Sequence, residues 1–256
     1  MAEIIAIANN KGGVGKTTTV LAIGRAWAAK GKKLLLVDLD SQANLTSTLL
    51  SEDYEAERTI ADAFIEKKNI PVENIEENID LAPSGLSLSN FDSITARFNS
   101  REFLLADLLA PVKNNYDFII LDCPPALGLI TYNAMVAANH LLMVATSDRY
   151  SYDGMMMIAQ IYNDVRESVR LNPKLSLDGV IITKYRKNKI SEMWLNKIRG
   201  EVGEIFVNPV IREATKIQQA TTFRKSFYEY DPDGTATTDY RQISEEIYRR
   251  VTANQQ

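Results

Sequence analysis

The chain of 256 residues is long enough for one large α/β domain and does not require two, so we expect a single domain over residues 1–256. Its 45% hydrophobic and 24% charged residues are typical of a globular protein, and no apolar run approaches the roughly 20 residues of a membrane span. The net charge of −4 allows only a local basic patch, and the single Cys123 and single His140 argue against a disulfide and a zinc site.

Short apolar runs alternate with longer amphipathic stretches along the chain. A strand is expected at residues 3–8, then a helix at 16–30 that Gly31 ends, and a strand at 33–38. A polar stretch over 51–77 contains a helix near 60–67, and a weak strand at 79–82, a helix at 101–112 and a strand at 117–122 follow. The second half continues with a helix at 131–138, a strand at 140–145, a helix at 153–169, a strand at 177–183, a helix at 190–202, a short strand at 205–207, and helices at 214–222 and 238–251. This order predicts an α/β fold, with a mainly parallel twisted sheet covered by helices on both faces.

A glycine-rich segment lies between the first expected strand and the first expected helix, which is the context of a P-loop. Backbone amides of such a loop and the N-terminus of the helix attract phosphate. Lys16 would reach the β- and γ-phosphates, the Thr17 hydroxyl would bind Mg²⁺, and Thr18 would donate to the α-phosphate. The sequence therefore predicts a P-loop NTPase whose nucleotide-binding residues are Lys11, Gly12, Gly13, Val14, Gly15, Lys16, Thr17 and Thr18.

Carboxylates end two of the expected strands. Asp38 and Asp40 close the second strand on the same side of it, and Asp122 closes the apolar run that begins at Phe118. Ligands of open α/β sheets bind at the carboxyl ends of the strands. Asp122 has the Walker B form and is predicted to hold Mg²⁺ directly or through water. Capping of the following segment is the alternative role for Asp38 and Asp40.

The P-loop departs from the general form because Asn10 occupies its first glycine position and Lys11 follows. This K-G-G-x-G-K-T-T variant resembles the deviant Walker A motif of the ParA/MinD family. The segment Asp38-Leu-Asp40-Ser-Gln42-Ala-Asn44 is similar to the family's D-x-D-P-Q-x-N, with serine in place of proline. The ending with Tyr230-Asp-Pro232, Ala236 and Tyr240 also resembles the family's, so the resemblance covers residues 4–246 and best fits the short ParA-type DNA-partition ATPases.

The resemblance implies an ATPase with weak intrinsic hydrolysis of ATP to ADP and phosphate, and ATP and Mg²⁺ as its cofactors. Lys11 would cross a nucleotide-sandwiched homodimer to the partner's phosphates, as a cation supplied in trans. Asp40 would orient the attacking water, and Asp38 would support the Mg²⁺ shell. The expected catalytic residues are therefore Lys11, Lys16 and Asp40, and the expected metal residues are Thr17, Asp38 and Asp122.

The resemblance also implies non-specific DNA binding by the ATP-bound dimer, and a centromere-binding partner protein that stimulates hydrolysis. Basic side chains for DNA phosphates follow the strand at 177–183 and recur further on. The alternative is a solvated basic edge. The candidates are Lys184, Arg186, Lys187, Lys189 and Lys216.

Two other functions stay open. A MinD-like membrane-associated positioning ATPase would end in a basic amphipathic helix, but the tail adds little apolar area beyond Ile247, Tyr248 and Val251. We therefore expect no membrane partner, and a cytoplasmic, nucleoid-associated protein. A P-loop ligase acting on a small metabolite remains possible because phosphate machinery does not name the acceptor.

Four further features are interpreted as structural or minor. Cys123 is expected to be a small buried thiol, and residues 155–157, three methionines, to pack in the core. His140 begins a strand without a visible partner and receives no role. Residues 208–212 are a candidate for contacting adenine.

Overall fold

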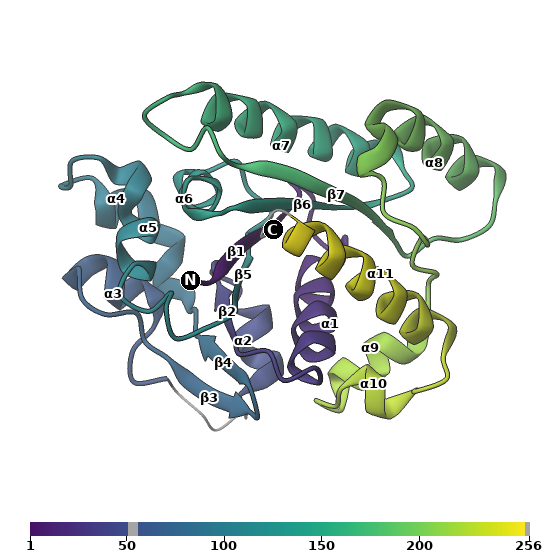
Figure 1. Cartoon of the computed structure of the whole chain (residues 1–256), viewed down its shortest axis with the longest axis horizontal. Coiled ribbons are helices and arrows are strands. Elements are labelled where there is room, and N and C mark those ends of the chain that lie inside the picture. Colours follow the sequence, from purple (N-terminus) through teal and green to yellow (C-terminus); the bar gives the residue numbers. More distant parts are fainter. Residues whose placement is uncertain (51–55, 254–256) are drawn as a thin grey trace.

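A seven-stranded sheet forms the centre of the computed structural model, which describes residues 1–50 and 56–253 (Figure 1). The strand order is β3-β4-β2-β5-β1-β6-β7. Neighbouring strands pair in parallel, except that β3 runs antiparallel to β4. The strands are β1 (Glu3–Ala8), β2 (Leu34–Asp38), β3 (Glu73–Glu76), β4 (Ile79–Ala82), β5 (Phe118–Asp122), β6 (His140–Thr146) and β7 (Ser176–Thr183).

Helices connect these strands and cover both faces of the sheet, with α6, α7 and α8 on one side of β6 and β7 and α1 and α11 on the other (Figure 1). Within the described residues, short 3₁₀ helices occur at Leu86–Asn90, Arg101–Phe103 and Gly203–Ile205. The α-helices are α1 (Lys16–Ala28), α2 (Asn44–Leu49), α3 (Ile60–Glu66), α4 (Phe91–Thr95), α5 (Leu104–Leu109), α6 (Leu129–Ala137), α7 (Arg149–Glu167), α8 (Lys189–Val202), α9 (Thr215–Thr222), α10 (Phe227–Tyr230) and α11 (Thr235–Thr252).

Alternation along each strand divides the core into two layers. In β1, Ile4 and Ala6 pack into the cluster that contains side chains of α3 to α8, whereas Ile5 and Ile7 pack into the cluster with α1 and α11. Burial of each isoleucine side chain contributes about 1.5–3 kcal/mol to the free energy of folding. The predicted mainly parallel sheet with helices on both faces is confirmed.

The last helix packs on the sheet through its apolar side. Ile247 and Val251 are buried in the cluster that also holds α1, and Tyr248 lies with its ring centroid 5.5 Å from that of Trp27. The Trp27 indole N–H donates to the carbonyl oxygen of Ser244 at 3.0 Å, so the two helices are also linked by a buried hydrogen bond. None of the helices in the described residues is long and apolar enough to cross a membrane.

The strand predicted at 205–207 is wrong. Phe206 forms only one isolated bridge, to Val180, and residues Gly203–Ile205 form a 3₁₀ turn. The Val207 amide still donates to the Val180 carbonyl, but Pro209 follows and has no N–H with which to extend a ladder.

The prediction that His140 lacks a partner is also wrong. Its Nδ1 lies 2.7 Å from Asp178 Oδ2 and its Nε2 lies 3.2 Å from Glu3 Oε2. All three residues stand at the amino ends of neighbouring strands, where only the folded sheet brings them together. The imidazole is buried with both nitrogens satisfied.

Only one of the three methionines follows the core prediction. Met155 is buried, whereas Met156 and Met157 are each 43% exposed. Successive helical residues point about 100° apart, so three in a row cannot all face the sheet. Cys123 is fully buried as predicted, and burial raises the pKa of its thiol to about 12, so it is not a nucleophile at neutral pH.

Candidate nucleotide-binding site

The glycine-rich loop runs from the carboxyl end of β1 to the start of α1. Parallel pairing of β1, β5 and β2 places Ile7 beside Asp122 and Asp122 beside Asp38. The two acidic strand ends therefore lie next to the loop. Gly13 and Gly15 have φ angles of +73° and +94°, which residues other than glycine rarely adopt.

The Lys16 side chain lies buried against the loop itself. Its ammonium donates to the carbonyl oxygens of Asn9 at 3.3 Å and Lys11 at 3.1 Å. Burial lowers the pKa of Lys16, and the nearby Asp122 carboxylate works in the opposite direction. This ammonium is positioned beside the loop that is predicted to hold phosphate.

Asp122 and Thr17 form the part of the site that fits Mg²⁺. The Thr17 hydroxyl donates to Asp122 Oδ2 at 2.7 Å, and Asp122 Oδ1 is buried without a hydrogen-bond partner among the described residues. A buried carboxylate oxygen normally has a partner, and Mg²⁺ prefers oxygen ligands. No group of three or more His, Cys, Asp or Glu that could hold a metal occurs in the described residues. Mg²⁺ is usually bound by one or two carboxylates together with phosphate and water oxygens.

Asp38 is fully buried and has the geometry of a helix cap. Its carboxylate accepts from the Thr46 amide at 2.9 Å and the Thr46 hydroxyl at 2.8 Å, in the first turns of α2. Asp38 also accepts the amide of Asp40 at 3.1 Å, and burial raises its pKa to about 6. Asp40 is only partly buried, and its Oδ1 accepts from the Gln42 amide at 3.0 Å.

Lys11 lies on the outer side of the loop and forms an ion pair within its own chain. Its ammonium is 2.9 Å from both carboxylate oxygens of Asp148, and the two side chains are 33% and 37% exposed. Asp148 also caps α7, because its Oδ1 accepts from the Ser151 amide at 3.0 Å. Burial alone would raise the pKa of Asp148, but hydrogen bonds from Thr146, Lys11 and Ser151 outweigh it and lower that pKa. Sequence reasoning missed Asp148, which has no signal in the chain beyond that of a helix cap.

A cavity of about 400 Å³ extends from the loop toward α9 and α11 and is suited to a nucleobase and ribose. Ile211 and Arg212, within the predicted adenine segment 208–212, lie in its wall. The buried carboxylate of Asp239 in α11 binds Arg212 through its backbone amide and guanidinium, at 2.7–3.0 Å. Other residues lining this cavity are Gly15, Thr18, Thr183, Lys184, Ala214 and Tyr240.

The five predicted DNA-binding residues lie in different environments. Lys187 and Lys189 are exposed, and the Lys216 ammonium lies 5.6 Å from the Tyr230 ring centroid. Arg186 forms a two-point ion pair with Glu213. Lys184 instead donates to the carbonyl oxygen of Gly13 at 2.6 Å, so it belongs to the surroundings of the phosphate loop.

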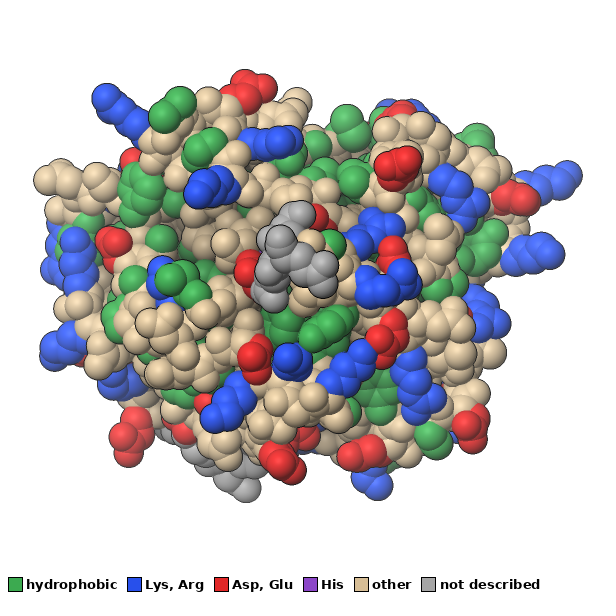
Figure 2. Space-filling model, in the orientation of Figure 1, with side chains coloured by type: hydrophobic (Ala, Val, Ile, Leu, Met, Phe, Trp, Pro, Cys, Tyr) green, Lys and Arg blue, Asp and Glu red, His purple; other side chains and the backbone are tan. Residues whose placement is uncertain are grey.

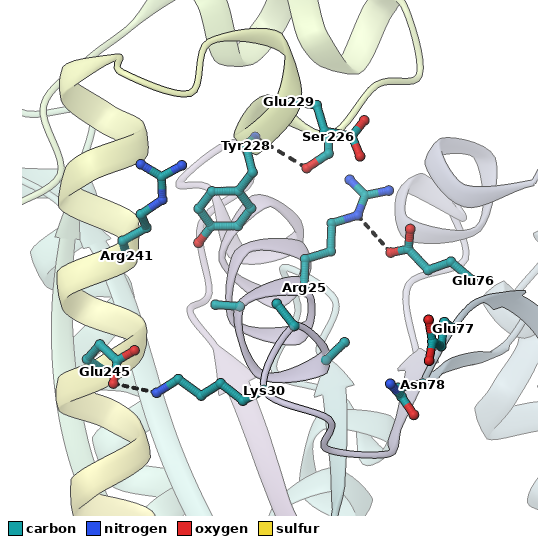
Figure 3. A pocket seen from close by; sticks show the side chains of 13 residues that line it. Arg25, Lys30, Glu76, Glu77, Asn78, Ser226, Tyr228, Glu229, Arg241 and Glu245 are labelled. Carbon is teal, nitrogen blue, oxygen red and sulfur yellow. Dashed lines mark hydrogen bonds and ion pairs between the residues drawn. The ribbon is translucent and has the colours of Figure 1, made fainter.

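A second cavity, of about 670 Å³, opens between α1, α10 and α11 away from these residues (Figure 3). Arg25 in its wall is paired with Glu76, and Lys30 is paired with Glu245. The surface around α11 shown in Figure 2 likewise mixes both signs of charge. None of the predicted site residues lines this cavity.

Known proteins are similar to this chain in sequence. A family model described as an AAA domain matches residues 2–177. The sporulation initiation inhibitor protein Soj of Bacillus subtilis is 32% identical over 96% of this chain and 98% of its own, and the chromosome partitioning protein ParA of Caulobacter vibrioides is 31% identical over 97% and 94%.

Solved structures show the same fold. Apo McdA of Cyanothece superposes with a TM-score of 0.85 at 24% identity, covering 97% of this chain and all of its own. A Mycobacterium smegmatis structure described as cobyrinic acid a,c-diamide synthase with bound ADP and magnesium has a TM-score of 0.84 at 26% identity, covering 99% and 97%. Since the family model spans more than half of the chain and Soj matches nearly all of it, the chain belongs to the ParA/MinD family of P-loop ATPases as a ParA-type member.

Proposed function

We propose that the chain is a partition ATPase that dimerises on binding ATP, holds DNA without sequence preference, and releases it after hydrolysis. The observation that carries this proposal is the pair of lysines on one loop, with Lys16 buried beside the loop and Lys11 reaching its exposed outer side. A single subunit needs only Lys16 to bind the phosphates of its own nucleotide. Lys11 is available to a nucleotide held by another copy of the chain.

The proposed ligands are ATP and Mg²⁺, held by residues 11–18 and by Thr17 with Asp122. Similar chains from M. smegmatis, at 25–26% identity, were solved with ADP or an ATP analogue and magnesium. When bound, Mg²⁺ supplies positive charge to the β- and γ-phosphate oxygens. Lys16 then binds the same phosphates, and Asp40, partly open to solvent, positions the attacking water.

Dimer formation requires Lys11 to exchange its partner. Its ion pair with Asp148 is about one third exposed, and such pairs contribute no more than about 1 kcal/mol. A hydrogen bond from the ammonium to a phosphate enclosed between two subunits contributes about 1.5–3 kcal/mol. The exchange is therefore favourable only where a second subunit brings a nucleotide.

The proposed DNA surface contains the exposed Lys187 and Lys189 with the adjacent Arg186, and Lys216 of α9 is a further candidate. Each subunit offers few phosphate contacts, so a dimer multiplies weak binding and steepens its dependence on salt. A partner protein that stimulates hydrolysis, by relation a centromere-binding protein, completes the proposed cycle on the nucleoid.

The test is co-sedimentation with double-stranded DNA over a range of salt, with ATP and with ADP. We expect retention with ATP alone. The double variant Lys187→Ala/Lys189→Ala should flatten the slope of log K against log salt by about 0.9 for each DNA phosphate that is no longer neutralised. Lys174→Ala, an exposed lysine before the start of β7, is the matched control and should keep the slope. Equal retention of DNA with ATP and with ADP would contradict nucleotide-dependent DNA binding. Binding to anionic vesicles in place of DNA would favour a MinD-like function.

A metabolite ligase is the second candidate, supported by the likeness to cobyrinic acid a,c-diamide synthase over 99% of this chain. Mass spectrometry of cobyrinic acid incubated with the chain, ATP, Mg²⁺ and ammonia tests it. An ATP-dependent amidated product would establish the ligase, and hydrolysis without product would favour the partition ATPase.

A further inference from the structure

Two consecutive residues at the end of β7 donate hydrogen bonds to two consecutive carbonyls of the phosphate loop. The Thr183 hydroxyl donates to the Val14 carbonyl oxygen at 2.5 Å, and the Lys184 ammonium donates to that of Gly13 at 2.6 Å. Thr183 is buried, whereas Lys184 is exposed and reaches over the outside of the loop. The loop is therefore fixed from one side at two adjacent peptide groups.

These contacts set the direction of the loop amides. A trans peptide group holds its C=O and the following N–H on opposite sides of one plane. A Gly13 carbonyl fixed toward β7 turns the Val14 N–H away from β7, and a fixed Val14 carbonyl does the same for the Gly15 N–H. Backbone N–H groups of this loop are the donors that cradle phosphate.

The local backbone makes such fixing necessary. Gly13 and Gly15 both have positive φ, and glycine peptide groups rotate more freely than those of other residues. Lys184 itself has a φ of +50°, which is uncommon for a residue with a side chain and is a feature often found at functional sites. The backbone holds it there, because the next amide, of Tyr185, donates to the Ile211 carbonyl at 2.9 Å.

Lys184 lines the cavities beside the phosphate loop together with Arg186, but apart from Lys187 and Lys189. It lines the 400 Å³ cavity with Gly15 and Thr18, and it lines a third cavity, of about 290 Å³, with Lys11 and Asp148. Lys187 and Lys189 line neither cavity. Lys184 thus lies between the 400 Å³ cavity and Lys11 of the loop.

We propose that Lys184 is a nucleotide-positioning residue, which with Thr183 orients the Val14 and Gly15 amides toward the phosphates, and is not a DNA contact. The inference rests on the proposed nucleotide-binding function. Because these amides bind phosphates common to ATP and ADP, the hydrogen bonds from Thr183 and Lys184 stabilise the bound substrate and the transition state equally. Its loss should raise KM for MgATP and leave kcat unchanged.

The test measures the Kd for ADP and for AMPPNP by calorimetry in Lys184→Met, which keeps the aliphatic stem and removes the ammonium. We expect both nucleotides to bind about tenfold more weakly, as when one charge-assisted hydrogen bond is removed. KM should rise by a similar factor at constant kcat, and the salt slope of DNA retention at saturating ATP should not change. Lys174→Met, at an exposed lysine before β7, is the matched control and should bind nucleotide with the original Kd.

Thr183 supplies a second arm. Thr183→Val should weaken the binding of both nucleotides, and Thr183→Ser should restore it. In the double variant of Thr183→Val with Lys184→Met, the Kd should rise by less than the product of the two single effects. Unchanged nucleotide Kd together with weaker DNA retention in Lys184→Met would overturn the inference and make Lys184 a DNA contact. Failure of the unsubstituted chain to bind any nucleotide would instead overturn the proposed function.

Discussion

The carboxyl group of Asp122 is the most strongly perturbed acid of the candidate site. Burial, followed by the negative charge of Asp38, raises its pKa to about 8. One oxygen accepts from Thr17 and the other has no partner in the described part of the chain. Because a cation binds the ionised form, Mg²⁺ binding should release protons and tighten as the pH rises toward 8.

The same perturbation predicts a pH-dependent stability without metal or nucleotide. The folded pKa of Asp122 lies above its value of 3.8 in an unfolded chain, so its carboxyl stabilises the fold below pH 4 and this contribution is lost as the pH rises through about 8. Asp122→Asn cannot ionise. The melting temperature of Asp122→Asn minus that of the unsubstituted chain should therefore increase between pH 5 and pH 9. A difference that stays constant over this range would contradict the assignment.

Residues of the phosphate loop could be predicted because they are contiguous and their pattern is specific. Their supporting contacts could not. Asp148, Thr183 and Lys184 reach the loop from 137 to 171 positions further along the chain. The sequence places Lys184 among the DNA-binding candidates because a cluster of basic residues carries no information about which member turns back toward the sheet.

Helix α7 supports the loop through close backbone contact at Gly154. A Cβ added there would lie 2.6 Å from Asn9 Oδ1 and 3.4 Å from the backbone of Asn10 and Lys11. The Asn9 side chain is itself fixed, since its amide donates to the Val144 carbonyl at 2.8 Å and its oxygen accepts from the Lys11 amide at 2.9 Å. The position of Lys11 therefore depends on the small size of residue 154.

Gly154→Ala should destabilise the fold by about 1–3 kcal/mol through overpacking, and should weaken nucleotide binding because the loop must shift. Gly200→Ala is the matched control in α8, since a Cβ there meets nothing within 4 Å. It should stabilise the fold by up to about 1 kcal/mol through helix propensity. Urea unfolding and ADP titration measure both effects. Equal stability of the two variants would show that α7 does not hold the loop.

Long elements are predictable from this sequence and most of the shortest are not, although the strand predicted at 79–82 matches the four-residue β4. The strand at 3–8 and the helix that Gly31 follows match β1 and α1, because apolar periodicity defines them. Helices α2, α4 and α10 and strand β3 have only four to six residues, too few for a period, and no prediction covers them. The Thr46 amide in α2 donates to the carboxylate of Asp38 from β2, a contact that exists only after folding.

Across the whole molecule, the two edges of the sheet differ. The carboxyl edge carries the phosphate loop, Asp38 and Asp122, and the amino edge carries His140 between Asp178 and Glu3. The ParA-type relatives match both halves of the chain, over 96–97% of its length. The proposed role of Lys11 requires two chains, because Lys11 gains its proposed phosphate only from a second copy.

Sedimentation velocity with MgATP tests this claim most directly. The Asp40→Ala variant is expected to retain ATP. Its apparent mass in MgATP should be twice the 28.7 kDa of one chain, and in ADP it should equal that of one chain. Adding Lys11→Ala should keep ATP binding and return the mass to that of one chain, while Lys33→Ala, an exposed lysine before β2, should remain paired. A Lys11→Ala variant that pairs as fully as its parent would contradict the account.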